Sequence, residues 1–306
     1  MSTKTSFTAS DGKQIGYYTW IPRGIVRGVV QIVHGMAEHA ARYDHFAVKL
    51  RSQGIAVYAC DLRGHGSTIE TPEETGYFGQ ENGWSRVTED LYEFTQLIKG
   101  EYPDKHIFLF GHSMGSFLSR TLMIDHGSAY DGVILSGTAS SPGFMGTIGK
   151  FIAHIAVGKD GGKVPNKMLD TMSFGSYNKA FKPNRTKFDW LSRDENMVDA
   201  YVEDPLCGFI ATSKFYEDLL TGLLYVNDIE NVKQIPDDLS VMLLSGAMDP
   251  VGKKGSGVKI VYKQLKAAGL KDVEIYLIPD ARHEVLNETN RNEIENLCFE
   301  WLISHR

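Results

Sequence analysis

The residues whose types and spacing most directly suggest chemistry are Gly111-His112-Ser113-Met114-Gly115. Four apolar residues, Ile107 to Phe110, come just before them and predict a short strand buried on both faces, and the residues that follow can continue as a helix. A serine on so tight a strand-to-helix turn projects its hydroxyl above a sheet. Ser113 is therefore a candidate nucleophile. At this point the alternative stays open that Ser113 only caps the following helix at a glycine-bounded turn.

A serine hydroxyl becomes an effective nucleophile only when a histidine takes its proton and a carboxylate orients that histidine. For a serine on this kind of turn, the chain order is serine, then aspartate or glutamate, then histidine. His283 follows the last predicted strand and is the candidate base. Asp249 follows the strand before that one and is the candidate carboxylate. Asp280 competes with Asp249 because it is close to His283 in sequence.

Attack on an ester places negative charge on the carbonyl oxygen, and backbone N–H groups must stabilise that charge. One N–H is expected from Met114, directly after the candidate nucleophile, and the other from a loop after an early strand. His34-Gly35-Met36 is such a loop, so Met36 is the second candidate donor. The alternative is a plain glycine turn with the Met36 side chain in the core.

Elements that could position these residues alternate along most of the chain, which predicts an α/β fold with helices on both faces of a mostly parallel sheet. An Asp-Gly turn predicts an antiparallel hairpin at the start. The eight expected strands are 5–8, 14–20, 28–33, 55–60, 107–110, 132–137, 240–245 and 273–278, and the expected helices include 43–53, 85–99, 213–226, 257–268 and 290–304. The catalytic core is expected to comprise 1–138 and 213–306.

The alternation stops between residues 139 and 212, which we call the cap segment. An insertion at this point is placed to cover the carboxyl edge of the sheet, where ligands bind. Phe144, Ile148 and Phe151 recur at helical spacing within it. One interpretation is that this helix face packs on the core. The other is an apolar gate that contacts the acyl chain and touches lipid surfaces transiently, in which case removing Phe144 and Phe151 impairs long-chain substrates most.

Composition narrows the function classes. A formal charge of −6 and an isoelectric point near 5.9 argue against a nucleic-acid partner. The three cysteines are far apart in sequence, with no metal or redox spacing, and suit a reducing compartment. There is no run of eighteen apolar residues and no apolar core of a signal peptide after Met1. These features predict a cytoplasmic protein without a metal or other cofactor.

Several short motifs together carry a more specific pattern: His34-Gly35-Met36-Ala37-Glu38-His39, Arg42-Tyr43, Asp61-Leu62-Arg63-Gly64-His65-Gly66-Ser67, Gly111-His112-Ser113-Met114-Gly115-Ser116, Asp249-Pro250 and His283-Glu284. The pattern resembles the monoacylglycerol lipase and lysophospholipase-like branch of the α/β-hydrolase superfamily. The resemblance implies a triad of Ser113, Asp249 and His283 with Met36 and Met114 as oxyanion donors.

The same resemblance places Glu38 and Arg42 near the alcohol portion of the substrate. An ion pair four residues apart on a helix surface would also explain these two residues. This chain departs from the best-known animal lipase of the family at Leu286, where that enzyme carries a second histidine. The departure leaves recognition of a glycerol headgroup open.

The leading hypothesis is a serine hydrolase that cleaves monoacylglycerols or similar acyl esters through an acyl-enzyme. A proline iminopeptidase is the main rival, because the same fold and triad serve both. The rival needs an acidic site for a substrate amine, for which the cap segment offers Glu195, Asp199, Glu203 and Asp204. A non-catalytic ligand-binding hydrolase fold is the third alternative. The sequence does not indicate an oligomeric state.

Overall fold

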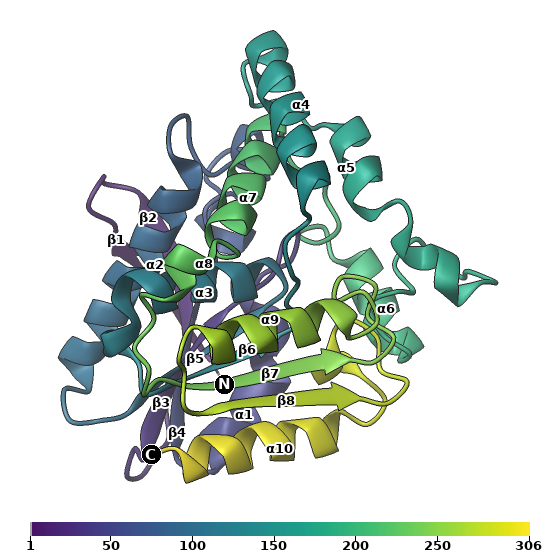
Figure 1. Ribbon diagram of the computed structural model, residues 1–306. Helices are drawn as coiled ribbons and strands as arrows, with labels where there is room; N and C mark the ends of the chain where they lie inside the picture. Colours follow the sequence, from purple (N-terminus) through teal and green to yellow (C-terminus); the bar gives the residue numbers. More distant parts are fainter. Residues whose placement is uncertain (1) are drawn as a thin grey trace.

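An eight-stranded sheet lies at the centre of the computed structural model, which describes residues 2–306 (Figure 1). Its strand order is β1-β2-β4-β3-β5-β6-β7-β8. The β1–β2 and β2–β4 pairs are antiparallel and the other pairs are parallel. The strands are β1 Thr3–Thr8, β2 Gln14–Trp20, β3 Gly28–Val33, β4 Ile55–Cys60, β5 Ile107–His112, β6 Gly132–Ser136, β7 Ser240–Gly246 and β8 Val273–Ile278.

Helices cover both faces of this sheet, which confirms the predicted fold class. On one face, α1 (Asp44–Ser52) and α10 (Arg291–Ser304) bury their apolar side chains in one core cluster. On the other face, α2 (Gly83–Glu101), α3 (Met114–His126) and α9 (Ser256–Ala267) contribute to a second cluster. The short 3₁₀ helices are Ala40–Tyr43, Gly66–Thr68, Pro72–Glu74, Gly127–Ala129, Tyr177–Phe181 and Val285–Asn287.

The central strand β5 shows why these elements form where they do. Successive side chains of a strand point to opposite faces. Ile107 and Leu109 accordingly lie in the cluster beneath α2 and α3, whereas Phe108 and Phe110 lie in the cluster beneath α1 and α10. Because both faces are covered, a continuous apolar run was the correct signal for this strand.

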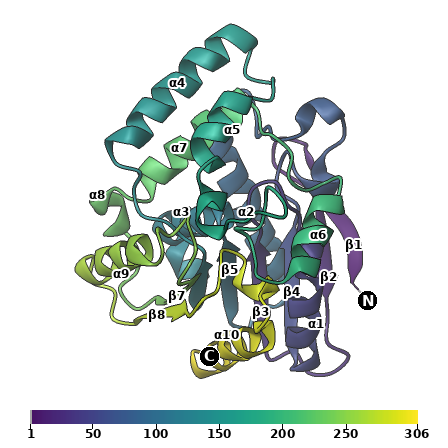
Figure 2. The same ribbon diagram turned by 90° about the vertical axis from the view of Figure 1, so that its right-hand side faces the viewer.

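The cap segment contains the helices α4 (Phe144–Asp160), α5 (Lys167–Phe174) and α6 (Glu195–Glu203). It holds no β-strand, only an isolated bridge between Pro165 and Thr212. Helix α7 (Ser213–Tyr225) follows it, and α8 (Ile229–Val232) leads back to the sheet. Figures 1 and 2 both show α4 lying alongside α7 and projecting beyond the sheet. Among residues 2–306, no helix has the length and apolar character needed to cross a membrane.

Candidate active site

Ser113 stands between the end of β5 and the start of α3, on a strained turn. Its backbone has φ 53° and ψ −121°, a region that residues with a side chain rarely adopt. The Ser113 N–H donates to the carbonyl of Ser136 at the end of the neighbouring strand, 2.9 Å away. Its side chain makes no capping hydrogen bond to α3. The geometry therefore favours a hydroxyl that is presented outward over one that caps the helix.

The two glycines of the motif are required by close approach of the surrounding backbone. A Cβ added to Gly115 would collide with the carbonyl oxygen of Val33, at the end of β3. A Cβ added to Gly111 would collide with Ser119 in α3 and with the carbonyl of Gly115. The glycines thus allow α3 to begin directly against the sheet, which holds Ser113 at the carboxyl edge.

His283 and Asp249 meet at the same edge, although 34 positions separate them in the chain. The Nδ1 of His283 lies 3.0 Å from Oδ2 of Asp249. Both side chains are buried. The Asp249 carboxylate also accepts hydrogen bonds from Ser245 Oγ (3.2 Å) and from the Val251 N–H (2.8 Å).

Asp280, the competing carboxylate, is exposed on the turn that follows β8. Its backbone has φ 58°, a left-handed conformation that aspartate tolerates better than most residues. This placement fits a residue that forms the turn. The structure thus places the buried carboxylate of Asp249 beside His283 and leaves Asp280 exposed to solvent.

The charges around His283 decide its protonation behaviour. Burial alone would lower the pKa of His283, but the Asp249 carboxylate beside it, with Glu284 and Glu38, raises it above its usual value. The imidazole of His112 packs against His283 with 4.7 Å between ring centroids, and burial lowers the pKa of His112 to about 4. His283 can therefore hold a proton during a reaction while His112 stays neutral.

Two backbone N–H groups flank Ser113 as candidate oxyanion donors. Met114 is the first residue of α3, where backbone N–H groups have no acceptor within the helix. Met36 lies in the turn after β3, and a Cβ on the preceding Gly35 would come within 3.2 Å of Ser113 Cβ. The Gly35 N–H donates to Oε1 of Glu38 at 2.5 Å, which fixes this turn.

Ser113, His283 and Met36 line one cavity of about 550 Å³. The loops after β3, β5 and β8 form its floor, and the cap segment supplies most of its walls. Those walls are largely apolar and include Phe174, Phe188, Trp190, Leu191, Phe209 and Ile210. The Trp190 ring lies 5.1 Å from the His283 ring. Such a cavity suits an apolar ligand whose reactive group reaches Ser113.

The three cap residues expected to contact an acyl chain are not among those lining this cavity. Phe144 and Phe151 are 78% and 64% exposed, and Ile148 is half-buried. Helix α4 turns its small residues inward instead, with Ala153 fully buried and Gly149 against Leu220 of α7. The Phe144 and Phe151 side chains are directed outward, whereas Ile152 is half-buried and packs against the core cluster.

Glu38 lines the cavity, whereas Arg42 does not. The two side chains do form the expected ion pair, with 2.7 Å between Nη1 and Oε2. Glu38 is buried and the Arg42 side chain is only 10% exposed, so the pair does not lie on an open helix surface, and Arg42 also pairs with Glu284. Sequence reasoning quoted Glu284 in the His283-Glu284 motif without giving it a role, and it missed Trp190 and Tyr201 as residues near the site. The scattered aromatics of the cap segment were the only signal for the last two.

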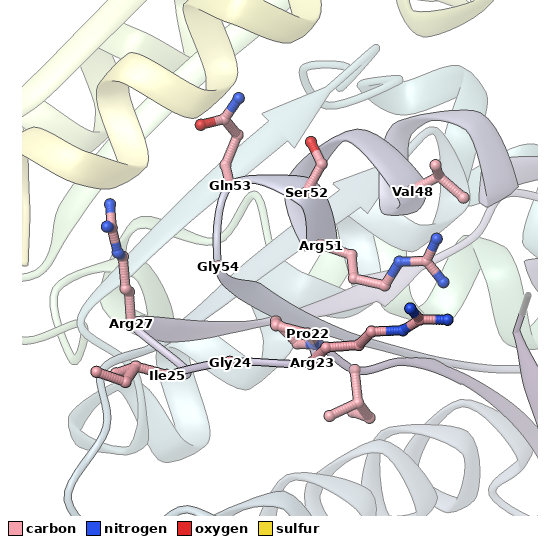
Figure 3. Close-up of a pocket in the computed structure, with 11 residues that line it drawn as sticks. Pro22, Arg23, Gly24, Ile25, Arg27, Val48, Arg51, Ser52, Gln53 and Gly54 are labelled. Atoms are coloured by element: carbon pink, nitrogen blue, oxygen red, sulfur yellow. The ribbon is translucent and has the colours of Figure 1, made fainter.

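A second cleft of about 1050 Å³ opens near the amino ends of β3 and β4, away from Ser113. The loop of residues 21–27 and the end of α1 form it, and three arginines line it (Figure 3). Arg27 points away from Arg23 and Arg51, so the guanidinium groups do not converge on one point. None of the candidate catalytic residues lines this cleft.

Two groups of side chains among residues 2–306 have donor atoms close enough to hold a metal ion, namely His39 with Asp204 and Cys207, and Asp272 with Glu274 and His305. Neither group includes Ser113, Asp249 or His283. In the first group the Nε2 of His39 already lies 2.9 Å from Oδ2 of Asp204.

A family model described as serine aminopeptidase, S33, matches residues 24–290. The chain belongs to this family. The match spans strands β3 to β8, the cap segment and the three candidate catalytic residues, and the family shares the α/β-hydrolase fold. The resemblance seen in the sequence motifs is thereby confirmed at the level of the family.

Several relatives of this family member carry names of lipases and esterases. It is 26% identical to a monoacylglycerol lipase of Mycolicibacterium smegmatis, over 98% of this chain and 96% of that one. It is 25% identical to the monoglyceride lipase of Mus musculus, over 97% of this chain and 89% of that one. A solved structure of a thermostable carboxyl esterase from Bacillus coagulans, in complex with glycerol, superposes on this chain with a TM-score of 0.92. The two sequences are 27% identical, and the superposition covers 99% of this chain and 98% of the esterase. The chain is thus a monoacylglycerol lipase-like α/β hydrolase.

Proposed function

We propose that this protein hydrolyses carboxylic esters of the monoacylglycerol type through an acyl-enzyme on Ser113. The observation that carries the proposal is the cavity lined by both Ser113 and His283, with Asp249 buried 3.0 Å behind the histidine. The names of the relatives support an ester substrate. Lysophospholipids, which also carry a single acyl ester, belong to the same substrate range.

In the first half of the reaction, Nε2 of His283 takes the proton of the Ser113 hydroxyl as the oxygen attacks the ester carbonyl carbon. The N–H groups of Met36 and Met114 stabilise the resulting oxyanion. Asp249 stabilises the imidazolium ion. The carbon–oxygen bond to the alcohol then breaks, and His283 donates its proton to the leaving alcohol, so that the acyl group remains on Ser113.

In the second half, water takes the place of the alcohol. His283 removes a proton from this water as it attacks the acyl carbonyl, and the same N–H groups stabilise the second oxyanion. The bond to Ser113 breaks, and the serine oxygen recovers a proton from His283. The products are the free alcohol and a carboxylic acid.

The apolar cavity wall supports a substrate with a hydrocarbon chain. Outside the cavity, Phe144, Met145, Phe151 and Ile155 of α4 are exposed, and Met168 and Met172 of α5 are exposed as well. Exposed apolar side chains gathered on adjacent helices are typical of a surface that contacts lipid. We propose that α4 touches lipid surfaces transiently while the substrate enters.

The peptidase alternative finds less support. None of Glu195, Asp199, Glu203 and Asp204 lines the cavity, and Asp199 and Asp204 pair with Arg185 and His39. Three carboxylates do line it. Those of Glu38 and Glu284 already accept hydrogen bonds from Arg42, and that of Asp170 accepts one from the Tyr216 hydroxyl at 3.1 Å. A substrate amine would therefore have to compete with Arg42 at Glu38 and Glu284, and only Asp170, on the cap segment, stands apart from those ion pairs.

Hydrolysis of a series of monoacylglycerols and lysophospholipids, run beside a fluorogenic proline amide, tests the proposal. The variant Ser113→Ala should lose at least about 10⁴-fold in kcat, because the hydroxyl is the attacking atom. Ser119→Ala is the matched control, since Ser119 is a buried serine of α3, the helix that follows Ser113, and its hydroxyl has no hydrogen-bond partner among the described residues.

A fluorophosphonate probe supplies a second readout, because it reacts with an activated serine. Labelling of the wild type and of Ser119→Ala, but not of Ser113→Ala, is expected. Turnover of the proline amide alone would overturn the ester proposal. A folded protein that neither hydrolyses an ester nor takes the label would point to the ligand-binding alternative.

A further inference from the structure

A junction of buried charges lies beside the candidate triad and is centred on Arg42. Its Nη1 lies 2.7 Å from Oε2 of Glu38 and 2.7 Å from Oε1 of Glu284, and its Nη2 lies 2.8 Å from Oε2 of Glu284. The three side chains are 10%, 4% and 6% exposed for Arg42, Glu38 and Glu284. One guanidinium therefore joins two carboxylates that are 246 positions apart in the chain.

The Glu38 arm of the junction fixes the turn that carries the candidate oxyanion donor Met36. Oε1 of Glu38 accepts the Gly35 N–H at 2.5 Å and the Tyr43 hydroxyl at 2.9 Å. Because Gly35 immediately precedes Met36, the direction of the Met36 N–H depends on where this carboxylate is held.

The Glu284 arm fixes the backbone directly after His283. Its Oε2 accepts a hydrogen bond from Nδ2 of Asn287 at 2.8 Å, and its N–H donates to the carbonyl of Leu191 at 2.7 Å. The position of the His283 ring therefore depends on the position of this glutamate.

The cap segment covers the junction from a third side. The ring of Tyr201, from α6, lies 4.8 Å from Cζ of Arg42 and stacks against the guanidinium. The Tyr201 hydroxyl donates to the carbonyl of Ala37 at 2.9 Å, in the same turn as Met36. Arg42 does not line the substrate cavity. Its contacts are with Glu38, Glu284 and Tyr201, which do line it.

The charges of the junction persist at neutral pH. Burial alone would raise the pKa of Glu38, but Arg42, His112 and His34 lower it to about 2. Arg42 likewise outweighs burial at Glu284 and lowers the pKa of that carboxyl. An arginine is suited to this position because its planar fork can hold a carboxylate through two parallel hydrogen bonds, which a lysine cannot do.

We propose that Arg42 is a positioning residue that sets the Met36 N–H and the His283 ring relative to each other by holding Glu38 and Glu284 at the same time. The inference rests on the proposed roles of Ser113, Met36 and His283. On this proposal, loss of Arg42 slows the chemical step and so lowers kcat. An arginine that binds the alcohol portion of the substrate would act on substrate binding instead.

The variants Arg42→Lys and Glu284→Gln test this assignment from two sides. Arg42→Lys keeps the charge and loses the fork, so kcat should fall by about 10² with KM within about threefold, because a misplacement of about 1 Å costs that much. The pH at which activity falls on the acid side should stay where it is in the wild type.

Glu284→Gln keeps the shape and removes a charge. His283 is faced by the carboxylates of Asp249, Glu284 and Glu38 and by the imidazole of His112. Removing one of these carboxylates lowers the pKa of His283, so the acid limb of kcat/KM should move to lower pH while kcat also falls. A side chain with a purely structural role would leave this limb unchanged.

Arg63→Met is the matched control, because Arg63 is also a buried arginine between two carboxylates, Asp11 and Asp90, outside the cavity. It should lower the melting temperature without changing the KM or the acid limb. A rise in KM with unchanged kcat in Arg42→Lys would overturn the proposal, as would an unchanged acid limb in folded Glu284→Gln. Failure of the proposed function would appear separately, as a wild-type protein without esterase activity or fluorophosphonate labelling.

Discussion

Helix α4 and the stretch from Phe174 to Ile210 both belong to the cap segment and are both rich in large apolar side chains, but they place them differently. The later stretch turns Phe188, Trp190 and Phe209 into the cavity above Ser113. Helix α4 packs on α7 through small residues and leaves Phe144 and Phe151 in solvent. The difference teaches that apolar residues of a cap serve the substrate only where the chain folds back over the nucleophile.

Among substitutions in the cap segment, the largest effect is expected from Trp190, which packs against the His283 ring. Trp190→Ala should lower kcat/KM by roughly 10- to 100-fold, because the ring that holds the base in place is lost. Trp190→Phe, which retains an aromatic ring at this position, should recover most of the activity. Steady-state kinetics at saturating and limiting substrate measure the effect. Equal activity of the alanine variant and the wild type would contradict the conclusion that the stretch from Phe174 to Ile210, unlike α4, serves the catalytic site.

A smaller and more selective effect is expected from Phe209, on the cavity wall. Phe209→Ala should lower kcat/KM for long-chain esters by about tenfold, since burial of a chain against a phenyl ring contributes roughly 1.5 kcal/mol. Acetyl esters, which do not reach the wall, should be hydrolysed nearly as well as by the wild type. A uniform loss across all chain lengths would show that Phe209 does not contact the acyl chain.

The double substitution Phe144→Ser and Phe151→Ser should act only at a lipid surface. Hydrolysis of a long-chain substrate presented in vesicles should fall several-fold, while hydrolysis of a dissolved short-chain ester stays unchanged. Because both side chains are exposed, stability should change by less than about 0.5 kcal/mol. A vesicle flotation assay measures binding directly. Undiminished vesicle binding by this variant would rule out α4 as the contact surface.

The smallest effect is expected from Asp204, which ties the cap segment to the loop after β3 through His39 at 2.9 Å. Burial would raise the pKa of Asp204, but the hydrogen bond from His39 outweighs it and lowers that pKa. The stabilisation is therefore present above the unfolded pKa of about 4 and is lost as the pH falls through the folded value.

Asp204→Asn should cost less than about 1 kcal/mol at neutral pH, because solvent screens this partly exposed pair. The difference from the wild type should shrink in thermal unfolding carried out at acidic pH. A difference that grows toward low pH would contradict the assigned direction of the pKa shift.

Most of the features that could be predicted depend on residues that are close together in the sequence. The strands 28–33, 55–60 and 273–278 have the observed bounds, because a parallel sheet covered on both faces needs continuous apolar runs. The expected helix bounds differ from the observed ones by one or two residues, since helix ends depend on local hydrogen bonding. The order of Ser113, Asp249 and His283 follows from chain topology alone.

Contacts between distant segments could not be predicted in the same way. Helical spacing grouped Phe144, Ile148 and Phe151 on one stripe, but spacing does not say whether a stripe meets the core, the cavity or solvent. The pairing of Arg42 with Glu284 across 242 positions has no local signal at all. The same holds for Trp190 against His283, because loop conformation brings these residues together.

The sequence by itself determined the fold class, the family resemblance and the loops that carry the candidate nucleophile, base and carboxylate. These features depend on short motifs and on the alternation of strands and helices, which local residue order encodes. Only the tertiary structure decided which carboxylate lies beside His283, which apolar residues wall the cavity and what Arg42 holds. Those depend on where distant loops meet at the edge of the sheet, and that is set by the packing of the whole chain.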